Sequence, residues 1–298
     1  MDLGPKHLQI VSNTRDLFGS LFDDAAIFPP GNKALDQAVV DHVRLAQGDL
    51  AALLGSFVVS DSRIDDLGKV ATEARSELLP LSVTVRHPSI LGQLRERLSV
   101  LNLVDQVLSL EMVIPNSVDV DSAIAQITHS ANTAWPGHVD VYIEVPRNNR
   151  RHTVLAAISR SPFRAKFRTG GTEAALYPSS SELAESILSA VQLGIAFKAT
   201  AGLHHAIRNR DPVTGFEQHG FLNVMMAVEA CLAGSAVQQV AEILDCRNGD
   251  LVARWAHGLL TEKARSLRHF FRAFGTCSIA EPVGDLVSLG LLEAVETE

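Results

Sequence analysis

The sequence predicts an α/β fold, a single (β/α)8 barrel of the TIM type. Short apolar runs rich in Val, Ile and Phe alternate with amphipathic segments along the 298 residues. This alternation is typical of a parallel sheet whose strands are joined by helical crossovers. Eight such units favour a closed barrel over an open sheet, and no G-x-G-x-x-G motif follows the first run. One domain over residues 1–298 is therefore expected.

The expected strands are short and end at Gly, Pro, Asn or Ser, as buried parallel strands do. In chain order they are Leu21–Phe28, Ser56–Ser60, Leu79–Val85, Val107–Ile114, Val139–Val145, Arg164–Arg168, Ala196–Thr200 and Arg272–Thr276.

The segments between these strands have helical periodicity. Ala34–Ala46 carries an apolar stripe, and Ser181–Leu193 follows two serines, Ser179 and Ser180, of which either can cap the helix. A helix over about residues 6–20 is expected before the first strand, where it would plug the bottom of the barrel.

The segment 203–270 is longer than one crossover needs. Its clearest helices are Asn223–Ala233 and Ala236–Leu244. We expect this helical insertion between the seventh and eighth strands to form a lid or a subunit interface.

Composition narrows the class of protein. The chain has 26 Lys and Arg against 34 Asp and Glu, a net charge of −8, and no basic stripe, which argues against a nucleic-acid partner. No apolar run is long enough to span a membrane, and no export signal is recognisable. Three unclustered cysteines do not indicate disulfides or a zinc knuckle. We expect a cytoplasmic protein that acts on a small molecule, with a homo-oligomer left open.

Two lysines lie inside strand-like runs at the expected carboxyl ends. Because side chains alternate along a strand, Lys166 and Arg168 should face the barrel interior while Phe167 faces the helices. The same parity turns Lys198 inward. Mutual repulsion and burial would lower both lysine pKa values and leave a neutral amine, as a Schiff-base nucleophile requires. The alternative is that each lysine reaches the barrel mouth or pairs with Glu144 or Glu111.

Five motifs in consecutive order resemble deoxyribose-phosphate aldolase, a class I (Schiff-base) aldolase barrel, over about residues 110–278. They are Leu110–Pro115 (LEMVIP), Ile143–Glu144 (IE), Lys166–Gly170 (KFRTG), Lys198–Gly202 (KATAG) and Phe274–Ser278 (FGTCS).

The resemblance implies roles for these residues. Lys166 would form the Schiff base, Lys198 would lower its pKa, and Glu111 would relay protons with a bound water. Gly171, Gly202 and the backbone near Ser278 would help to hold a phosphate. The resemblance implies no cofactor.

The chain also departs from the family pattern. Glu111 stands in place of an aspartate, Arg168 in place of a small serine, and Ala201 in place of the first glycine of a phosphate loop. Arg168 can hold a carboxylate or phosphate by a bidentate contact. We therefore expect an aldolase-type lyase for a sugar-like, possibly anionic, carbonyl substrate other than that of the family.

Two other functions stay open. His204 and His205 follow the seventh strand and, with Glu144, Glu111 or Asp24, would suit a divalent-metal lyase or isomerase. Adjacent histidines point in different directions, however, so acid–base work or substrate hydrogen bonding fits them better. A barrel that only binds a small anion at Arg168 is the third possibility.

The first expected strand ends in an unusual segment. Either Asp23 or Asp24 can face the barrel centre, and we assign Asp24 to substrate binding. Residues 28–32 (FPPGN) form either a stiff loop across the barrel mouth or a turn that leads into the next helix. Cys277 lies at a strand end and is expected to be a small buried residue.

Overall fold

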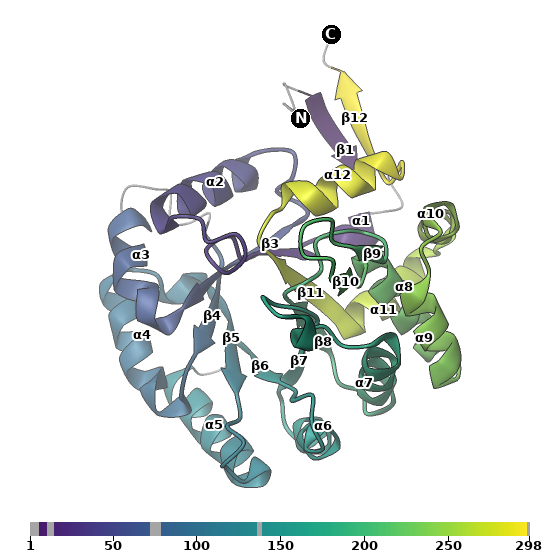
Figure 1. Ribbon diagram of the computed structural model, residues 1–298. Helices are drawn as coiled ribbons and strands as arrows, with labels where there is room; N and C mark the ends of the chain where they lie inside the picture. The colour runs from purple at the N-terminus through teal and green to yellow at the C-terminus, as the bar shows by residue number, and fades with distance from the viewer. Residues whose placement is uncertain (1–5, 11–14, 72–78, 136–138, 297–298) are drawn as a thin grey trace.

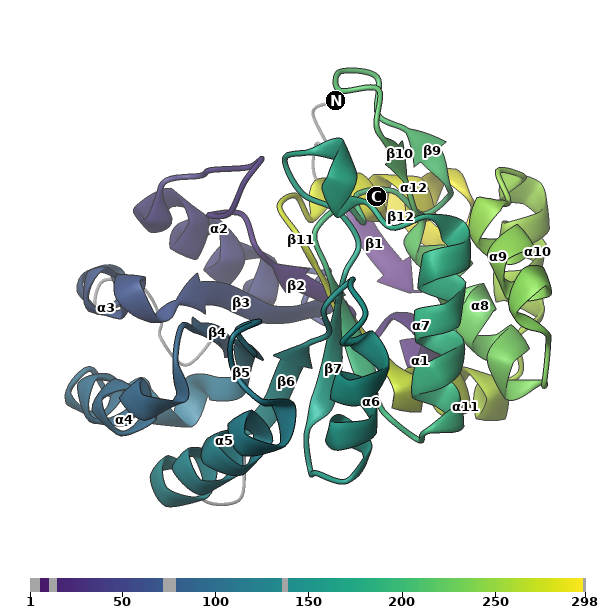
Figure 2. The ribbon, with the colours of Figure 1, turned by 60° about the horizontal axis from the view of Figure 1, so that its bottom comes forward.

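A computed structural model describes residues 6–10, 15–71, 79–135 and 139–296. Eight parallel strands close into a barrel in the order β11-β2-β3-β4-β5-β6-β7-β8, and helices surround it (Figures 1 and 2). The strands are β2 (Phe22–Asp24), β3 (Leu54–Ser60), β4 (Leu81–Val85), β5 (Val107–Val113), β6 (Asp140–Glu144), β7 (Arg164–Arg168), β8 (Phe197–Thr200) and β11 (Phe271–Thr276). The predicted (β/α)8 barrel and its eight strands are confirmed, but the first strand ends at Asp24 and not at Phe28 as expected.

Helices follow the strands as the crossovers require. They are α2 (Leu35–Gln47), α3 (Ile64–Ala71), α4 (Leu91–Val100), α5 (Val120–Ala134), α6 (Arg151–Ser159), α7 (Ser180–Gln192) and α12 (Ala280–Ser288). Of the two candidate caps of α7, Ser179 is the one used, since its side chain accepts a hydrogen bond from the backbone N–H of Glu182 at 3.2 Å.

Strand alternation separates an apolar outer layer from a polar interior. Phe167 and Phe197 face outward, where their ring centroids lie 5.0 Å apart. Lys166 and Lys198 occupy paired positions in the register of β7 and β8, and both are buried inside the barrel. The inward orientation predicted for the two lysines is therefore confirmed, and it positions the site.

The predicted N-terminal helix over residues 6–20 is wrong for most of its length. Lys6–Ile10 forms strand β1, which pairs antiparallel with β12 (Leu292–Glu296) outside the barrel (Figure 1). Helix α1 covers only Arg15–Phe18, and residues 11–14 lie outside the described residues. The segment KHLQI takes the extended form because it finds a partner strand at the opposite end of the chain, which local periodicity does not reveal.

The long insertion is helical, as predicted, and contains α8 (Phe221–Leu232), α9 (Val237–Asp245), α10 (Gly249–Gly258) and α11 (Thr261–Phe270). These helices lie together on one flank of the barrel beside α7 (Figures 1 and 2). A short hairpin of β9 (Asn209–Arg210) and β10 (Glu217–Gln218) precedes them. Phe221 of α8 packs its ring 5.0 Å from that of Phe274 in β11. The helices thus belong to the barrel wall and do not form the expected lid; a subunit interface on them stays a prediction.

Within the described residues, no helix combines the length and apolarity needed to cross a bilayer.

Candidate active site

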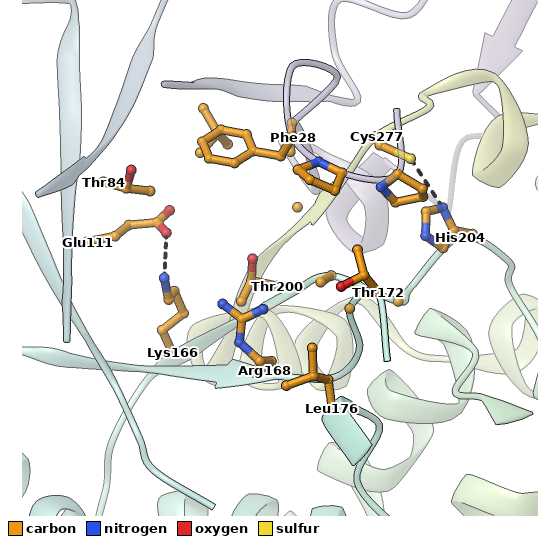
Figure 3. Close-up of a pocket in the computed structure, with 18 of the residues that line it drawn as sticks. Phe28, Thr84, Glu111, Lys166, Arg168, Thr172, Leu176, Thr200, His204 and Cys277 are labelled. Carbon is orange, nitrogen blue, oxygen red and sulfur yellow. Dashed lines mark hydrogen bonds and ion pairs between the residues drawn. The ribbon is translucent and has the colours of Figure 1, made fainter. Parts of the chain in front are cut away.

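A cavity of about 310 Å³ opens at the carboxyl ends of the barrel strands (Figure 3). This is the end of the barrel at which TIM-barrel active sites lie. Seven residues predicted for the site line the cavity, namely Glu111, Lys166, Arg168, Gly171, Lys198, Gly202 and His204. Residues selected from the ends of three strands, β5, β7 and β8, thus gather around one cavity.

A chain of buried ion pairs forms the floor of this pocket. Glu111 bridges the two lysines, with Oε1 2.6 Å from Lys198 Nζ and Oε2 3.0 Å from Lys166 Nζ. Lys166 is also 3.0 Å from Glu144 Oε2, and Lys198 is 2.5 Å from Asp23 Oδ2. Arg168 Nε donates to Glu144 at 3.2 Å. Carboxylates and cations thus alternate from Asp23 to Arg168.

Two serines and a tyrosine support this floor. Ser82 Oγ donates to Glu111 at 2.7 Å, and Ser109 Oγ donates to Ser82 at 2.6 Å. Lys198 Nζ lies 5.3 Å from the centre of the Tyr142 ring, within range of a cation–π interaction. These contacts fix the Glu111 carboxylate between the two lysines.

The expected lowering of the lysine pKa values is wrong. Burial acts to lower the pKa of Lys166, but Glu111 and Glu144 outweigh it and the pKa is raised. For Lys198, burial is likewise outweighed by Asp23 and Glu111, so its pKa is also raised. The repulsion between the two ammonium groups is compensated, because the Glu111 carboxylate lies between them.

The acidic partners shift in the opposite direction. Burial acts to raise the pKa of Glu111, but Lys198 and Lys166 hold it far below its usual range. The pKa of Glu144 is lowered in the same way, against burial, by Lys166 and Arg168. The resting site therefore holds ionised carboxylates and protonated lysines.

The structure brings Asp23, and not Asp24, into the site. Asp24 Oδ2 lies 3.0 Å from His42 Nδ1 of α2, and Asp24 Oδ1 accepts from the backbone N–H of Ala26 at 3.1 Å. Asp24 is therefore turned toward the outer helices, where it ends β2, and it does not line the pocket. Phe22, two residues earlier, shares its face and packs against Phe221, so the parity of β2 carried a signal that would have selected Asp23.

The loops after β7 and β8 approach each other closely. Gly202 has a φ of +74°, and a Cβ there would lie 2.7 Å from the carbonyl oxygen of Thr169. Ala201 adopts a φ of +62°, in the left-handed region that favours glycine. A Cβ at Gly171 would collide with Leu176. These glycines let the backbone itself form one wall of the pocket.

The two adjacent histidines separate, as expected. His204 Nδ1 lies 3.1 Å from Glu281 Oε2 and 3.7 Å from Cys277 Sγ at the pocket mouth (Figure 3). Burial acts to lower the pKa of His204, but Cys277 and Glu281 raise it to about 10. His205 instead pairs with Asp285 at 3.1 Å and does not line the pocket.

The alternative of a metal site built from His204, His205 and a carboxylate is not supported. Glu144 is held by Lys166 and Arg168, whereas each of the two histidines pairs with a carboxylate of α12. Over the described ranges no group of three or more His, Cys, Asp or Glu side chains is arranged to hold a metal ion.

At the end of β11, the pocket is lined by Cys277 and not by Ser278. Cys277 is half-buried, so the expectation of a fully buried residue is wrong. Phe28, Pro29 and Pro30 also line the pocket, which favours the loop across the mouth over the capping turn. The sequence prediction did not include Asp23, Ser82 and Tyr142, which support the floor, or the lining residues Thr84, Tyr177 and Thr200.

Comparisons with known proteins agree with the fold. No protein-family model matches the chain, and no curated protein sequence does. Among solved structures, the deoxyribose phosphate aldolase from Aeropyrum pernix superposes with a TM-score of 0.54 at 12% identity, over 92% of this chain and 93% of that one. An aldo/keto reductase from Klebsiella pneumoniae gives a TM-score of 0.47 at 14% identity, over 93% and 87%. At such low identity, the likeness to the Aeropyrum pernix enzyme supports the barrel fold alone.

Proposed function

We propose that this barrel is a class I aldolase-type lyase that makes or breaks a carbon–carbon bond through a Schiff base on Lys166. One observation carries the proposal: a buried lysine facing a pocket, with a carboxylate oxygen of Glu111 and one of Glu144 each 3.0 Å from Nζ. This arrangement stabilises a cation at the Lys166 nitrogen, and the Schiff base of a class I aldolase is such a cation when protonated.

In this mechanism a carboxylate beside Lys166 accepts and returns the protons that Schiff-base formation requires. Transfer of a proton from Lys166 to Glu144 across their hydrogen bond leaves a neutral amine that attacks the substrate carbonyl carbon. The new carbon–nitrogen bond gives a carbinolamine, whose hydroxyl takes a proton and leaves as water. The resulting iminium restores the positive charge between the two carboxylates.

Bond cleavage follows from the iminium. A base removes the proton of the hydroxyl group on the β-carbon, which is the far carbon of the bond that breaks. The electron pair of that bond moves toward the iminium, and the β-carbon departs as an aldehyde. The remaining enamine takes a proton at carbon and is hydrolysed to release Lys166. Glu111, held anionic by Lys198 and Ser82, is suited to act as this base through a water molecule.

In this account Lys198 is a positioning residue. Its ammonium group holds Glu111 and Asp23 in place and supplies the charge that keeps Glu111 ionised. Gly55 leaves room for the Asp23 carboxylate, because a Cβ at position 55 would collide with Asp23 Oδ1.

The pocket favours a small substrate with an anionic end. Arg168 lines the cavity with its side chain 36% exposed, and it can donate to a carboxylate or phosphate at the mouth. The loop walls formed by Gly171 and Gly202 allow backbone N–H groups to approach such an anion. His204 supplies a further cation at the same end of the pocket.

Hydrogen exchange at carbon tests this function with simple carbonyl compounds in place of the true substrate. The enzyme should exchange the hydrogens next to the carbonyl of at least one small aldehyde or ketone for deuterium in D2O, as followed by proton NMR. Lys166→Arg, which keeps the charge between Glu111 and Glu144, should show only the background rate. Equal exchange by both proteins, or by neither across the panel, would contradict the proposal.

A further inference from the structure

A second cavity, of about 460 Å³, lies at the opposite end of the barrel. Its walls include the first residues of β3, β6 and β7, namely Leu54, Asp140 and Arg164, which places it at the amino-terminal face. Lys198 and Asp23 border this lower cavity. They also belong to the ion-pair floor of the pocket at the carboxyl end of the barrel, here called the upper pocket. The floor therefore separates two cavities.

The lower cavity has more cations than its carboxylates can balance. Its charged lining residues are Asp16, Asp23, Asp140, Arg164, Lys198, Arg268 and Arg272. Asp23 is paired with Lys198, Asp140 with Arg164, and Asp16 with Arg265 outside the lining. Across the part of the chain that the structure describes, neither Arg268 nor Arg272 forms an ion pair with a carboxylate.

Arg268 is anchored in a way that leaves its charge uncompensated. Its two terminal nitrogens donate to the backbone carbonyls of Phe271 and Gly19, each at 2.8 Å. These bonds fix the guanidinium but supply no negative charge. Burial first, and then the charge of Arg272, lower the pKa of Arg268 to about 10. Two guanidinium groups thus repel each other at one site of a chain whose net charge is −8.

The charge pattern distinguishes this site from an ordinary solvated surface. Among the described residues, exposed arginines such as Arg95 and Arg254 also lack a carboxylate partner, but water compensates for their charge, whereas Arg268 is not exposed and burial lowers its pKa. The carboxylate whose charge does reach Arg268 is already engaged, because Asp23 is committed to Lys198. A negative charge from outside the chain would relieve the repulsion that the local residues leave.

We propose that the amino-terminal cavity binds a small oxyanion of the phosphate type between Arg268 and Arg272. Planar guanidinium groups suit tetrahedral oxyanions because each can donate two parallel hydrogen bonds. The cavity is large enough for inorganic phosphate or for a small phosphomonoester. Because Lys198 and Asp23 border it from above, an anion here would act on the floor of the upper pocket from the opposite side.

Thermal unfolding and calorimetry with inorganic phosphate test this site without any assay of catalysis. In the wild-type protein, phosphate should raise the melting temperature more than sodium chloride of the same ionic strength, since a ligand that binds only the folded state stabilises it. Arg272→Met should weaken phosphate binding by about tenfold or more. Arg272 is exposed, so the substitution should leave the fold intact, and Arg272→Gln is a more polar second variant.

Two controls locate the anion. Arg254→Met removes an exposed arginine of α10 that does not line the cavity, and it should keep the wild-type response. Arg168→Met removes the anion contact proposed for the pocket at the carboxyl end, and it should leave intact the part of the response that Arg272→Met removes. No phosphate response in the wild type, an unchanged response in both Arg272 variants, or a response lost only in Arg168→Met would each overturn the proposal. Repeating the titration with glycerol phosphate then shows whether the site prefers the free ion or its ester.

Discussion

Glu111 Oε1 lies 2.6 Å from Lys198 Nζ, and the other oxygen of the same carboxylate forms an ion pair with Lys166. Both groups are buried. A buried carboxylate stays ionised only where cations and hydrogen-bond donors compensate for lost water. Lys198 therefore determines the protonation state of Glu111, and through it the chemistry available at Lys166.

Removal of Lys198 should destabilise the protein strongly. Lys198→Met leaves Asp23 and Glu111 buried with less compensation, and such a loss costs about 3–5 kcal/mol. The free energy of unfolding from urea titrations at pH 7 measures it. The double variant Lys198→Met/Asp23→Asn should recover part of the loss, because one uncompensated charge is removed; additive losses would contradict the network.

The same substitution should change how stability depends on pH. The folded-state pKa of Glu111 is lowered, so its ion pairing contributes stability above its unfolded pKa and loses that contribution as pH falls through the folded value. In Lys198→Met this contribution is missing, so the difference in unfolding free energy from the wild type should be greatest near neutral pH. It should shrink below about pH 4, where Glu111 is protonated in the unfolded chain. A difference that is constant with pH would argue against the assigned role.

Lys166 should be essential for turnover, and another cationic side chain at this position should not restore activity. Lys166→Arg retains a cation for Glu111 and Glu144 and should unfold at nearly the wild-type denaturant concentration, yet lack activity. Lys166→Met should also lack activity and in addition lose about 3 kcal/mol of stability, since two carboxylates lose their partner. Activity in Lys166→Arg would exclude Schiff-base chemistry at this position.

The rate of Schiff-base formation should increase with pH. Because the pKa of Lys166 is raised, the ammonium form predominates near neutrality, and the neutral amine becomes more abundant as pH rises toward that pKa. The initial rate of reductive trapping should therefore climb from about pH 7 to about pH 9. A rate that falls over this interval would mean that a different group limits the reaction.

Arg168 should discriminate between anionic and neutral substrates. A hydrogen bond to a charged group contributes about 1.5–3 kcal/mol, so Arg168→Met should raise KM for a carboxylated or phosphorylated carbonyl compound roughly tenfold to a hundredfold. KM for an uncharged aldehyde should change little. Arg160→Met, which removes an exposed arginine paired with Asp121, is the matched control. Equal effects on both substrate types would remove Arg168 from substrate recognition.

The three cysteines should differ in their reaction with iodoacetamide. Cys277 lines the pocket, whereas Cys231 is buried and burial raises its pKa to about 11. Peptide mapping should find Cys277 alkylated well before Cys231, because the thiolate is the reacting form. A ligand reduced onto Lys166 should slow the labelling of Cys277 and leave that of Cys246 unchanged. Unprotected Cys277 would place the ligand elsewhere.

The local sequence pattern was sufficient to predict the barrel and the inward orientation of its two lysines. The apolar runs marked every strand of the barrel, and the alternation of Lys166 with Phe167 decided which side chain faces the interior. The same rule was available for Phe22 and Asp24 and would have selected Asp23 in β2.

The features that the sequence did not predict depend on contacts between residues far apart in the chain. The pairing of β1 with β12 joins the two ends of the chain, so residues 6–10 looked helical in isolation. The direction of the lysine pKa values depends on carboxylates from β2, β5 and β6 that converge only in the closed barrel. The sequence placed two lysines on adjacent strands and named Glu111 and Glu144 as alternative partners, but it could not decide whether these carboxylates outweigh burial.

Borohydride trapping tests the central claim most directly. The wild-type protein is incubated with small aldehydes and ketones, reduced with borohydride, and examined by intact mass and peptide mapping. The account predicts a single reduced adduct on Lys166, absent from Lys166→Arg and present, though formed more slowly, in Lys198→Met if that variant folds. Adducts confined to exposed lysines such as Lys33, or no adduct with any carbonyl compound, would contradict it.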